Sequence, residues 1–406
     1  MTEPVERKYE LYTQEAKANA YELFAKMRQE NPVHCQPGID GQTMIWFVTS
    51  YDEVEQVLRD DKHFVREARN ALPPEQVFQP DPLQAMMSNH MLNKDWDDHR
   101  RLRTLVSQAF TPRRIQTLRP RIQTIANELL DGVASQGKMD LIADYSFHLP
   151  TIVIAEMLGI PVEDREKFKV WSNAALTPTL DDESVAEFIK LMQEFMAYLT
   201  NLFAERRKMP GDDLLSALLE AEADGDSLNE SELFAMLFLL IIAGHETTVS
   251  LIANAMVALW QHPDQLALLK KEPERMKTAV EEFLRYDNSV ERAFNRWVAE
   301  DVTLGDQFLP KGSLIIPILA AANHDPEKFA QPERLDINRE SNNHLSFGKG
   351  AHYCLGAPLA RLETEIALNT LLERLPNIQM SIPFSELRWR LSPGFRTLEA
   401  LPVQWE

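Results

Sequence analysis

The chain has few cysteines and no excess of basic residues, and both features restrict the classes of protein to which it can belong. Only two cysteines, Cys35 and Cys354, occur among its 406 residues. That usage excludes a disulfide-stabilised secreted fold and favours a reducing compartment. Acidic residues outnumber basic ones, and the formal net charge is −20. Such a charge argues against nucleic acid or an anionic membrane surface as a partner.

The sequence also lacks a hydrophobic run long enough to span a bilayer. Its longest apolar run, Leu233 to Ala243, is too short, and residues 1–21 are charged and polar rather than signal-like. Low-complexity segments, internal repeats and linkers are absent too. With 44% hydrophobic residues, the chain can bury a substantial core. We therefore expect a single domain over residues 1–406, soluble, cytoplasmic and monomeric, with no membrane contact.

Among what is present, residues 347–356 carry the clearest chemical signal, Phe-Gly-Lys-Gly-Ala-His-Tyr-Cys-Leu-Gly. Gly348 and Gly350 allow positive φ and a close approach of the backbone. Pro358 and apolar residues at helical spacing predict a helix just after the cysteine. A sulfur at that helix N-terminus faces unpaired N–H groups, so we expect a lowered pKa and a metal-binding thiolate. The alternative is that Cys354 is a small buried hydrophobe.

A second signal interrupts a helix that we expect from Ser227 to Trp260, buried on every side. Its apolar run is broken by Gly244-His245-Glu246-Thr247-Thr248. Polar groups inside a buried helix are costly unless something uses them. Gly244 leaves room for a flat group against the backbone, and Thr247 can bond back to the carbonyl of Ala243. The alternative is a satisfied polar kink.

Hydrophobic periodicity gives a coarse map of the remaining elements. Ser227 and Glu230 have the spacing of a capping box for the long helix. Residues 71–93 show no period and are expected to form a long loop, of the kind that is often functional. Helices are predicted over 18–30, 51–60, 114–131, 151–158 and 184–207, and from Asp98 to Thr111-Pro112. Strands are predicted over 43–49, 314–319, 378–382, 387–391 and 398–403.

Together these motifs resemble the cytochrome P450 family, the haem-thiolate monooxygenases. The stretch around Cys354 is similar to the family's haem-binding signature, and Ala243-Gly244-x-Glu246-Thr247 to its oxygen-activation motif. The resemblance implies a mainly α fold with small β-sheets and a buried haem between the long central helix and the cysteine loop. It further implies Cys354 as the axial ligand of haem b iron, with Glu246 and Thr247 as the catalytic acid and alcohol that relay protons to dioxygen.

The resemblance also assigns residues that hold the haem. His99 and Arg103, at i and i+4 of one helix, would contact a propionate together with Arg296 and His352. Two carboxylates on a buried macrocycle need such cations or donors, because burying unpaired charge is expensive. The other cofactor-binding positions that it implies are Ala243, Gly244, Phe347, Gly348 and Gly356.

A structural motif of the family is also present, beside departures from the usual pattern. Glu282 and Arg285 match its Glu-x-x-Arg, a buried ion pair for which Arg334 is the expected third member. Ser289 stands where relatives usually carry a proline that bends the chain toward the haem. His324 stands where they usually carry an arginine.

The activity implied is insertion of one atom of O2 into an apolar small molecule. Electrons must come from outside, because the chain has no Gly-x-Gly-x-x-Gly motif and too few cysteines for an iron–sulfur cluster. We expect a ferredoxin- or flavodoxin-type donor to dock near Cys354, where positive charge is offered by Lys349 and by Arg100, Arg101, Arg103, Arg113, Arg114, Arg119 and Arg121. The alternative for these arginines is a solvated helix face.

Two other functions use the same cysteine. A peroxygenase would take hydrogen peroxide directly, and a haem sensor or carrier would perform no chemistry, but neither needs Glu246 and Thr247. The substrate class stays open among fatty acids, terpenes, steroids and polyketides, products typical of secondary metabolism. Candidate pocket-lining residues are Met86, Met87, Met91, Ala243, Val290, Ala293 and Phe294.

Overall fold

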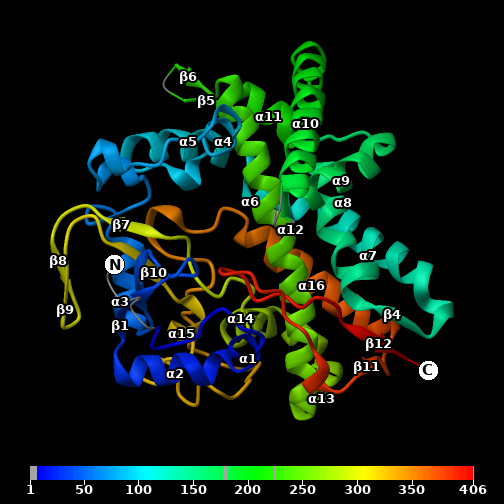
Figure 1. The fold of residues 1–406 in the computed structure, drawn as a ribbon. Helices are drawn as coiled ribbons and strands as arrows, with labels where there is room; N and C mark the ends of the chain where they lie inside the picture. The colour runs from blue at the N-terminus through cyan, green and yellow to red at the C-terminus, as the bar shows by residue number, and fades with distance from the viewer. Residues whose placement is uncertain (1–6, 177–181, 224, 406) are drawn as a thin grey trace.

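A computed structural model describes residues 7–176, 182–223 and 225–405 of the chain. Helices dominate it, and α12 (Glu230–Gln261), with 32 residues, runs through the middle of the molecule (Figure 1). Because this helix is apolar on nearly all sides, it is covered by other helices along most of its length, as expected for a core helix. Its partners include α8 (His148–Met157), α14 (Met276–Tyr286) and α16 (Ala357–Arg374).

The other α-helices are shorter or lie nearer the surface. They are α1 (Gln14–Ala18), α2 (Ala20–Glu30), α3 (Tyr51–Arg59), α4 (Pro82–Met87), α5 (Trp96–Ala109), α6 (Pro112–Thr117), α7 (Arg119–Val133), α9 (Arg165–Leu176), α10 (Asp182–Lys208), α11 (Leu214–Glu220), α13 (Pro263–Lys271) and α15 (Leu319–Ala322). The mainly α fold expected from the sequence is confirmed.

Small sheets flank the helices. The largest has the order β1-β2-β10-β7-β3, formed by Val33–Pro37, Met44–Val48, Leu314–Pro317, Arg296–Val298 and Phe64–Val65. β2 runs antiparallel to β1 and parallel to β10, which confirms the strands predicted at 43–49 and 314–319. A second sheet joins β11 (Gln379–Met380), β12 (Pro402–Gln404) and β4 (Lys138–Asp140), and two hairpins pair β5 (Glu222–Ala223) with β6 (Asp226–Ser227) and β8 (Val302–Leu304) with β9 (Gln307–Leu309).

The N-terminal cap of α12 differs from the prediction. Ser227 is not the cap, because it belongs to β6 and pairs with β5. Asn229 takes that place: its Oδ1 accepts from the N–H of Glu232 at 3.0 Å, and the Glu232 carboxylate accepts from the N–H of Asn229 at 3.0 Å. The capping box therefore exists, two residues later than its sequence signature indicated.

The buried ion pair of α14 also has a different third member. Arg285 donates to both carboxylate oxygens of Glu282, at 2.7 and 2.9 Å, and both side chains are fully buried. The third cation is Arg339, whose Nε lies 3.1 Å from Glu282 Oε2. The prediction of Arg334 is wrong: that residue contributes only its backbone carbonyl, which accepts from Arg285 at 3.0 Å.

One segment has more regular structure than predicted, and another has less. The loop expected over 71–93 contains α4, which begins at Pro82 with Asp81 and Gln84 forming a capping box. The strand predicted over 387–391 is absent, and this stretch has only an isolated bridge between Trp389 and Leu398. The helix α4 is short, so its periodic signal is weak, and residues 387–391 form one bridge and no continuous strand.

The length and composition of α12 would let it cross a membrane, although its uninterrupted apolar run is short. Its most apolar window has a mean hydropathy of 1.8, and 72% of that window is buried inside the protein. A core helix of a soluble protein has the same properties, so α12 is weak evidence for a membrane span.

Candidate active site

The loop before α16 holds the thiol of Cys354 in a fixed place. Gly348 and Gly350 have φ of 71° and 70°, as predicted. A Cβ on Gly350 would lie 2.7 Å from the carbonyl oxygen of Leu58, so this loop packs directly on the end of α3. The N–H of Cys354 donates to the carbonyl of Phe347 at 2.9 Å, and α16 starts three residues later. The cysteine therefore sits at a helix N-terminus, as the sequence indicated.

The pKa expected for this thiol is wrong in direction. Burial raises the pKa of Cys354 above its ordinary value. The backbone N–H groups of Gly356 and Ala357 and the guanidinium of Arg103 act the other way, but burial outweighs them. A thiolate here therefore needs a further positive charge, and a metal ion at the sulfur supplies one.

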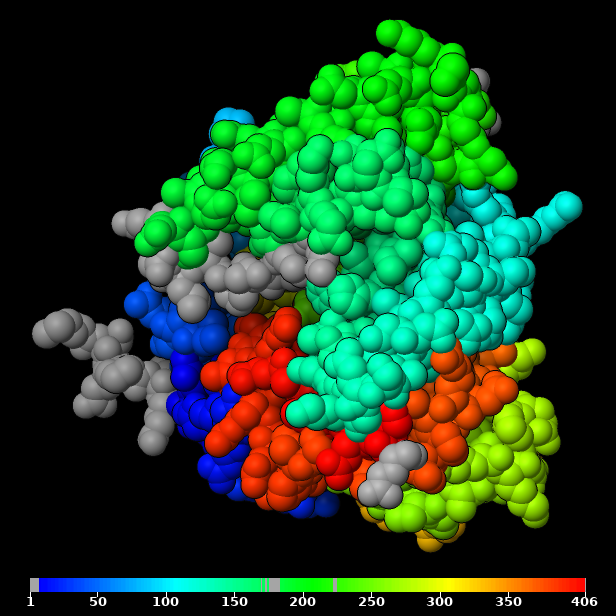
Figure 2. Space-filling view, turned by 90° about the vertical axis from the view of Figure 1, so that its right-hand side faces the viewer, coloured from blue at the N-terminus to red at the C-terminus, as the bar shows by residue number. Residues whose placement is uncertain are grey.

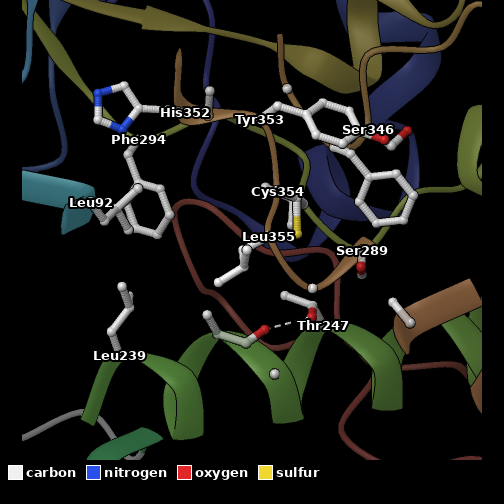
Figure 3. A pocket seen from close by; sticks show the side chains of 18 of the residues that line it. Leu92, Leu239, Thr247, Ser289, Phe294, Ser346, His352, Tyr353, Cys354 and Leu355 are labelled. Carbon is white, nitrogen blue, oxygen red and sulfur yellow. Dashed lines mark hydrogen bonds between the residues drawn. The ribbon is translucent and has the colours of Figure 1, made fainter. Parts of the chain in front are cut away.

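The sulfur points into a cavity of about 260 Å³ between the cysteine loop and α12. Figure 3 shows Cys354 on one side of this space and Thr247, from α12, facing it on the other. Most of the wall is apolar, with Leu239, Leu355 and Phe294 among the side chains that close it. A flat, largely apolar group would find contacts on both faces here.

One end of the cavity is polar, and it brings together the four residues predicted there. His99, Arg103, Arg296 and His352 all line it, and the two imidazole rings lie 4.1 Å apart. Burial lowers the pKa of both histidines and lowers that of Arg296 to about 10. Within the described part of the chain, the buried Nε2 of His99 has no hydrogen-bond partner.

A third arginine at this end was missed from the sequence. Arg66 lines the cavity, and burial, with Arg296 nearby, lowers its pKa to about 9. Its Nε donates to the carbonyl of Leu92 at 2.9 Å, and its guanidinium lies 5.5 Å from the ring of Phe294. Nothing in the local sequence distinguishes Arg66, because its position depends on segments that are distant along the chain.

The charges at this end fit the haem that the sequence resemblance implies. Asp95 is buried there and accepts from the backbone N–H groups of Arg66 and Glu67 at 2.7 and 2.9 Å. Three guanidinium groups line the cavity at this end, those of Arg66, Arg103 and Arg296. Positive groups of this kind suit the two carboxylates of a haem. The unpartnered nitrogen of His99 and the apolar walls fit the same group.

On α12, the residues of the predicted oxygen-activation motif separate into two groups. Ala243, Gly244 and Thr247 line the cavity, and Thr247 Oγ1 donates to the carbonyl of Ala243 at 2.8 Å, as predicted. Glu246 is not among the described lining residues. Its carboxylate lies 3.8 Å from Arg390 of the C-terminal segment, and burial raises its pKa. The structure thus brings the alcohol to the cavity and directs the acid away from it.

Most of the residues predicted to line the substrate pocket do line the cavity. Met91, Ala243, Val290, Ala293 and Phe294 line the cavity, together with Leu92, Leu240 and Phe395. Met86 and Met87 do not appear among the described lining residues, because α4 packs them against the main core. Ser289 also lies on the wall, and its carbonyl accepts from the N–H of Arg396 at 2.8 Å, so the chain is held here without a proline.

The departure at His324 has a structural explanation. Its ring is buried, stacks on Tyr21 at 4.1 Å, and lies with Nε2 2.8 Å from the carbonyl of Tyr286. Burial lowers its pKa to about 3, so the imidazole is neutral at physiological pH. His324 therefore packs in the core between the N-terminal helices and α14 and does not reach the cavity.

The arginines proposed as a docking surface are largely paired with acidic groups. Arg101 bonds Glu232 and Asp226. The others that form ion pairs are Arg114 with Asp212, Arg119 with Glu365, and Arg121 with Glu156. Arg100 is exposed beside Asp97, Arg113 is exposed, and Lys349 is half-buried near the cysteine loop. Most of this cluster is therefore half-buried or engaged in ion pairs, and Arg100 and Arg113 are its exposed members.

Comparisons with known proteins agree with the site. The family described as cytochrome P450 matches residues 164–378. The chain is 42% identical over 389 residues to the polyketide biosynthesis cytochrome P450 PksS of Bacillus subtilis, covering 95% of each. It is also 42% identical over 395 residues to the cytochrome P450 monooxygenase PikC of Streptomyces venezuelae, covering 97% of this chain and 92% of PikC.

Solved structures give the same result. The structure of PksS from Bacillus subtilis matches with a TM-score of 0.91 and 40% identity, covering 98% of this chain and 100% of that one. The structure of P450BioI in complex with acyl carrier protein ligated to hexadec-9Z-enoic acid matches with a TM-score of 0.88 and 38% identity, covering 97% and 99%.

Proposed function

The chain belongs to the cytochrome P450 family and is a haem-thiolate monooxygenase with haem b as its cofactor. We propose that it oxidises an apolar small molecule of secondary metabolism in the cytoplasm. Haem supplies the redox chemistry that activates O2, with the thiolate donating electron density that favours O–O cleavage. The observation that carries the proposal is the cavity itself. It places Cys354 opposite Thr247 between apolar walls, with cations at one end.

Each residue has a proposed part in this arrangement. Cys354 would bind the haem iron through its sulfur, and Phe347, Gly348 and Gly356 shape the loop that presents it. His99, Arg103, Arg296 and His352 hold the propionates, and Arg66 adds a further positive charge. Ala243 and Gly244 leave room beside α12, because neither carries a large side chain. Thr247 would hold a proton at its Oγ1 beside the cavity, and Glu246, which pairs with Arg390, would be the acid that resupplies it.

The side chains that line the cavity indicate the class of substrate. Val290, Ala293, Phe294, Leu239 and Leu240 offer contact area without hydrogen-bonding groups, so we infer that a largely apolar molecule is bound. Two relatives support substrates of this kind: PksS is named for polyketide biosynthesis, and P450BioI was solved in complex with hexadec-9Z-enoic acid ligated acyl carrier protein.

Electrons are proposed to come from a separate ferredoxin- or flavodoxin-type protein. Its acidic surface would meet Arg100, Arg113 and Lys349 around the cysteine loop. Replacing Arg100 and Arg113 by glutamate should lower partner-driven turnover and reduce its salt dependence. If neither quantity changes, the partner does not dock on this face.

A spectrum tests the identification directly. The purified protein, reduced under carbon monoxide, should show the strongly red-shifted Soret band of an anionic sulfur ligand. Cys354→Ser should abolish this band, and Cys35→Ser should leave it unchanged, because Cys35 lies in β1 away from the cavity. Absence of the band in the wild-type protein, with no bound porphyrin, would disprove the proposed function.

A peroxide-driven peroxygenase is the second candidate. The observation that favours it is the position of Glu246, which pairs with Arg390 instead of lining the cavity. Product formation with hydrogen peroxide alone, compared with O2 plus an electron-donor system, separates the two. Turnover only with the donor system excludes the peroxygenase.

A further inference from the structure

Two chain segments pair to form one wall of the cavity. Val290 and Phe395 form an antiparallel bridge, the N–H of Arg396 donates to the carbonyl of Ser289 at 2.8 Å, and the N–H of Arg292 donates to the carbonyl of Gly394 at 3.2 Å. Val290 and Phe395 face the cavity, while Glu291 is buried behind the wall. The shape of this wall therefore depends on how the two segments are held from behind.

They are held by a lysine from the start of the chain. Lys17, on α1, is buried, and its ammonium donates to Glu291 Oε2 at 3.1 Å and to the carbonyl of Phe395 at 3.0 Å. One cation thus binds both segments of the wall. Figure 2 shows the N-terminal segment, in blue, next to the C-terminal one, in red, on this side of the molecule.

Other charged groups surround this ammonium. Arg292 Nε lies 3.0 Å from Glu291 Oε1, and Arg396 lies 2.6 Å from Asp287 and donates to the backbone carbonyl of Lys17. From α2, the hydroxyl of Tyr21 donates to Asp287 at 2.8 Å. Burial raises the pKa of Tyr21 well above its ordinary value, so that hydroxyl stays neutral. The other two cations, Arg292 and Arg396, are arginines and stay charged. Lys17 is therefore the cation in this group that can lose its charge near neutral pH.

We propose that Lys17 is a positioning residue which holds the Val290–Phe395 wall in its binding shape while protonated, so that the pocket binds ligands less well once the ammonium is deprotonated. The proposal rests on the proposed function, because it concerns the pocket of that site. Lys17 is not among the described residues that line the cavity, and it acts through Glu291 and the Phe395 carbonyl.

The direction of the pH effect follows from the surroundings. Burial, supported by Arg292 and Arg396 and opposed by Glu291, lowers the pKa of Lys17 to about 8. The ammonium is then about nine-tenths protonated at about pH 7 and about one-tenth at about pH 9. The ion pair with Glu291 is present at the lower pH and lost as the pH rises through about 8. Arginine at this position would stay charged throughout.

The test measures ligand binding in the distal pocket against pH. The probe is 4-phenylimidazole, whose binding to the haem protein is read from the Soret shift, titrated from about pH 7 to about pH 9. The wild-type Kd should rise by roughly fivefold over this range, a typical size for coupling between two sites. Lys17→Arg should keep a nearly constant Kd, and Lys17→Met should bind weakly at every pH. Lys26→Met, an exposed lysine of α2, serves as the control and should follow the wild type.

Three outcomes of the ligand titration would overturn the proposal: Lys17→Arg following the wild-type pH curve, a wild-type Kd that does not change, or Lys17→Met binding as tightly as the wild type at about pH 7. If Lys17→Met does not fold, the arginine variant still decides. Hydrogen exchange of residues 288–294 gives a readout that needs no haem: at about pH 9 they should exchange faster in the wild type than in Lys17→Arg. A wild-type protein that lacks the red-shifted carbon monoxide band would disprove the proposed function. Equal hydrogen exchange of residues 288–294 in the wild type and Lys17→Arg would disprove the role of Lys17 and leave the proposed function standing.

Discussion

The hydroxyl of Thr247 donates a hydrogen bond to the carbonyl oxygen of Ala243, 2.8 Å away and one turn earlier in α12. Both residues line the cavity opposite Cys354. The bond fixes the side-chain rotamer and keeps the oxygen atom of Thr247 within the site. An alcohol held in this way can accept a hydrogen bond from an incoming group, and it can pass on its own proton once it releases the carbonyl of Ala243.

Thr247→Ala should therefore uncouple oxygen consumption from product formation. We expect product per O2 consumed to fall on the order of tenfold, less than for a general acid that water cannot replace. Parallel assays of O2 uptake, peroxide release and product test this. Thr247→Ser keeps the hydroxyl and should retain most of the coupling. Equal coupling in the alanine variant and the wild type would remove Thr247 from the proton path.

The cysteine loop was predictable because its signal is local. Gly348, Gly350 and Cys354 lie within seven residues, and positive φ with a following helix can be inferred from residue types alone. The hydrogen bond from Thr247 to Ala243 is local for the same reason, since it spans a single helical turn. Such short-range geometry is set by the backbone and needs no knowledge of the tertiary structure.

Interactions between distant segments were not predictable in this way. Arg339 was missed as the partner of Glu282, because Arg334 lies on the same stretch and only the path of the chain decides between them. Arg390, which pairs with Glu246, and Lys17, which pairs with Glu291, lie more than a hundred residues from their partners. A single sequence carries no signal for such pairs.

A related prediction concerns stability. Arg339→Ala should destabilise the protein by roughly 2–3 kcal/mol, at or just below the range for breaking a buried ion pair, because Arg285 still pairs with Glu282. Arg334→Ala removes an exposed side chain and should change the free energy of unfolding by less than about 0.5 kcal/mol. Denaturant unfolding of both variants checks this. Equal losses would mean that Arg339 has no special role.

Gly350 provides a test of the loop geometry. Gly350→Ala places a Cβ at a φ of 70° and 2.7 Å from the Leu58 carbonyl, so it should cost about 1–3 kcal/mol and weaken haem retention. Gly132→Ala, in α7 with nothing within 4 Å of the new Cβ, should stabilise by about 0.5–1 kcal/mol. Thermal unfolding and haem loss measure both. An unstrained Gly350→Ala would show that the loop can move away from α3.

Glu363 has an unusual position for a carboxyl group. It lies on α16 at the cavity wall, 1% exposed, and its Oε2 has no hydrogen-bond partner among the described residues. Burial raises its pKa from the ordinary value of 4.5 to about 8, and a hydrogen bond with Thr248 offsets only part of this shift. The side chain is therefore mostly protonated in the folded protein at neutral pH.

The pH dependence of stability follows from this proton. Between about pH 4.5 and about pH 8 the folded protein keeps it while the unfolded chain has lost it. The favourable contribution is thus fully present below about pH 4.5 and is lost as the pH rises to about 8. Glu363→Gln is neutral in both states and should not lose stability over this interval. Its advantage over the wild type should grow to a few kcal/mol, since each pKa unit corresponds to about 1.4 kcal/mol.

Urea unfolding of the wild type and Glu363→Gln at about pH 5 and about pH 8 measures this difference. Glu373→Gln is the matched control, because Glu373 lies on the same helix with an exposed side chain and should follow the wild type at both values. If the Glu363→Gln and wild-type curves run parallel, the carboxyl titrates at an ordinary pKa in the folded state. In that case a counter-charge or water must reach Glu363 from the cavity, because burial without such compensation would keep the proton on the carboxyl group.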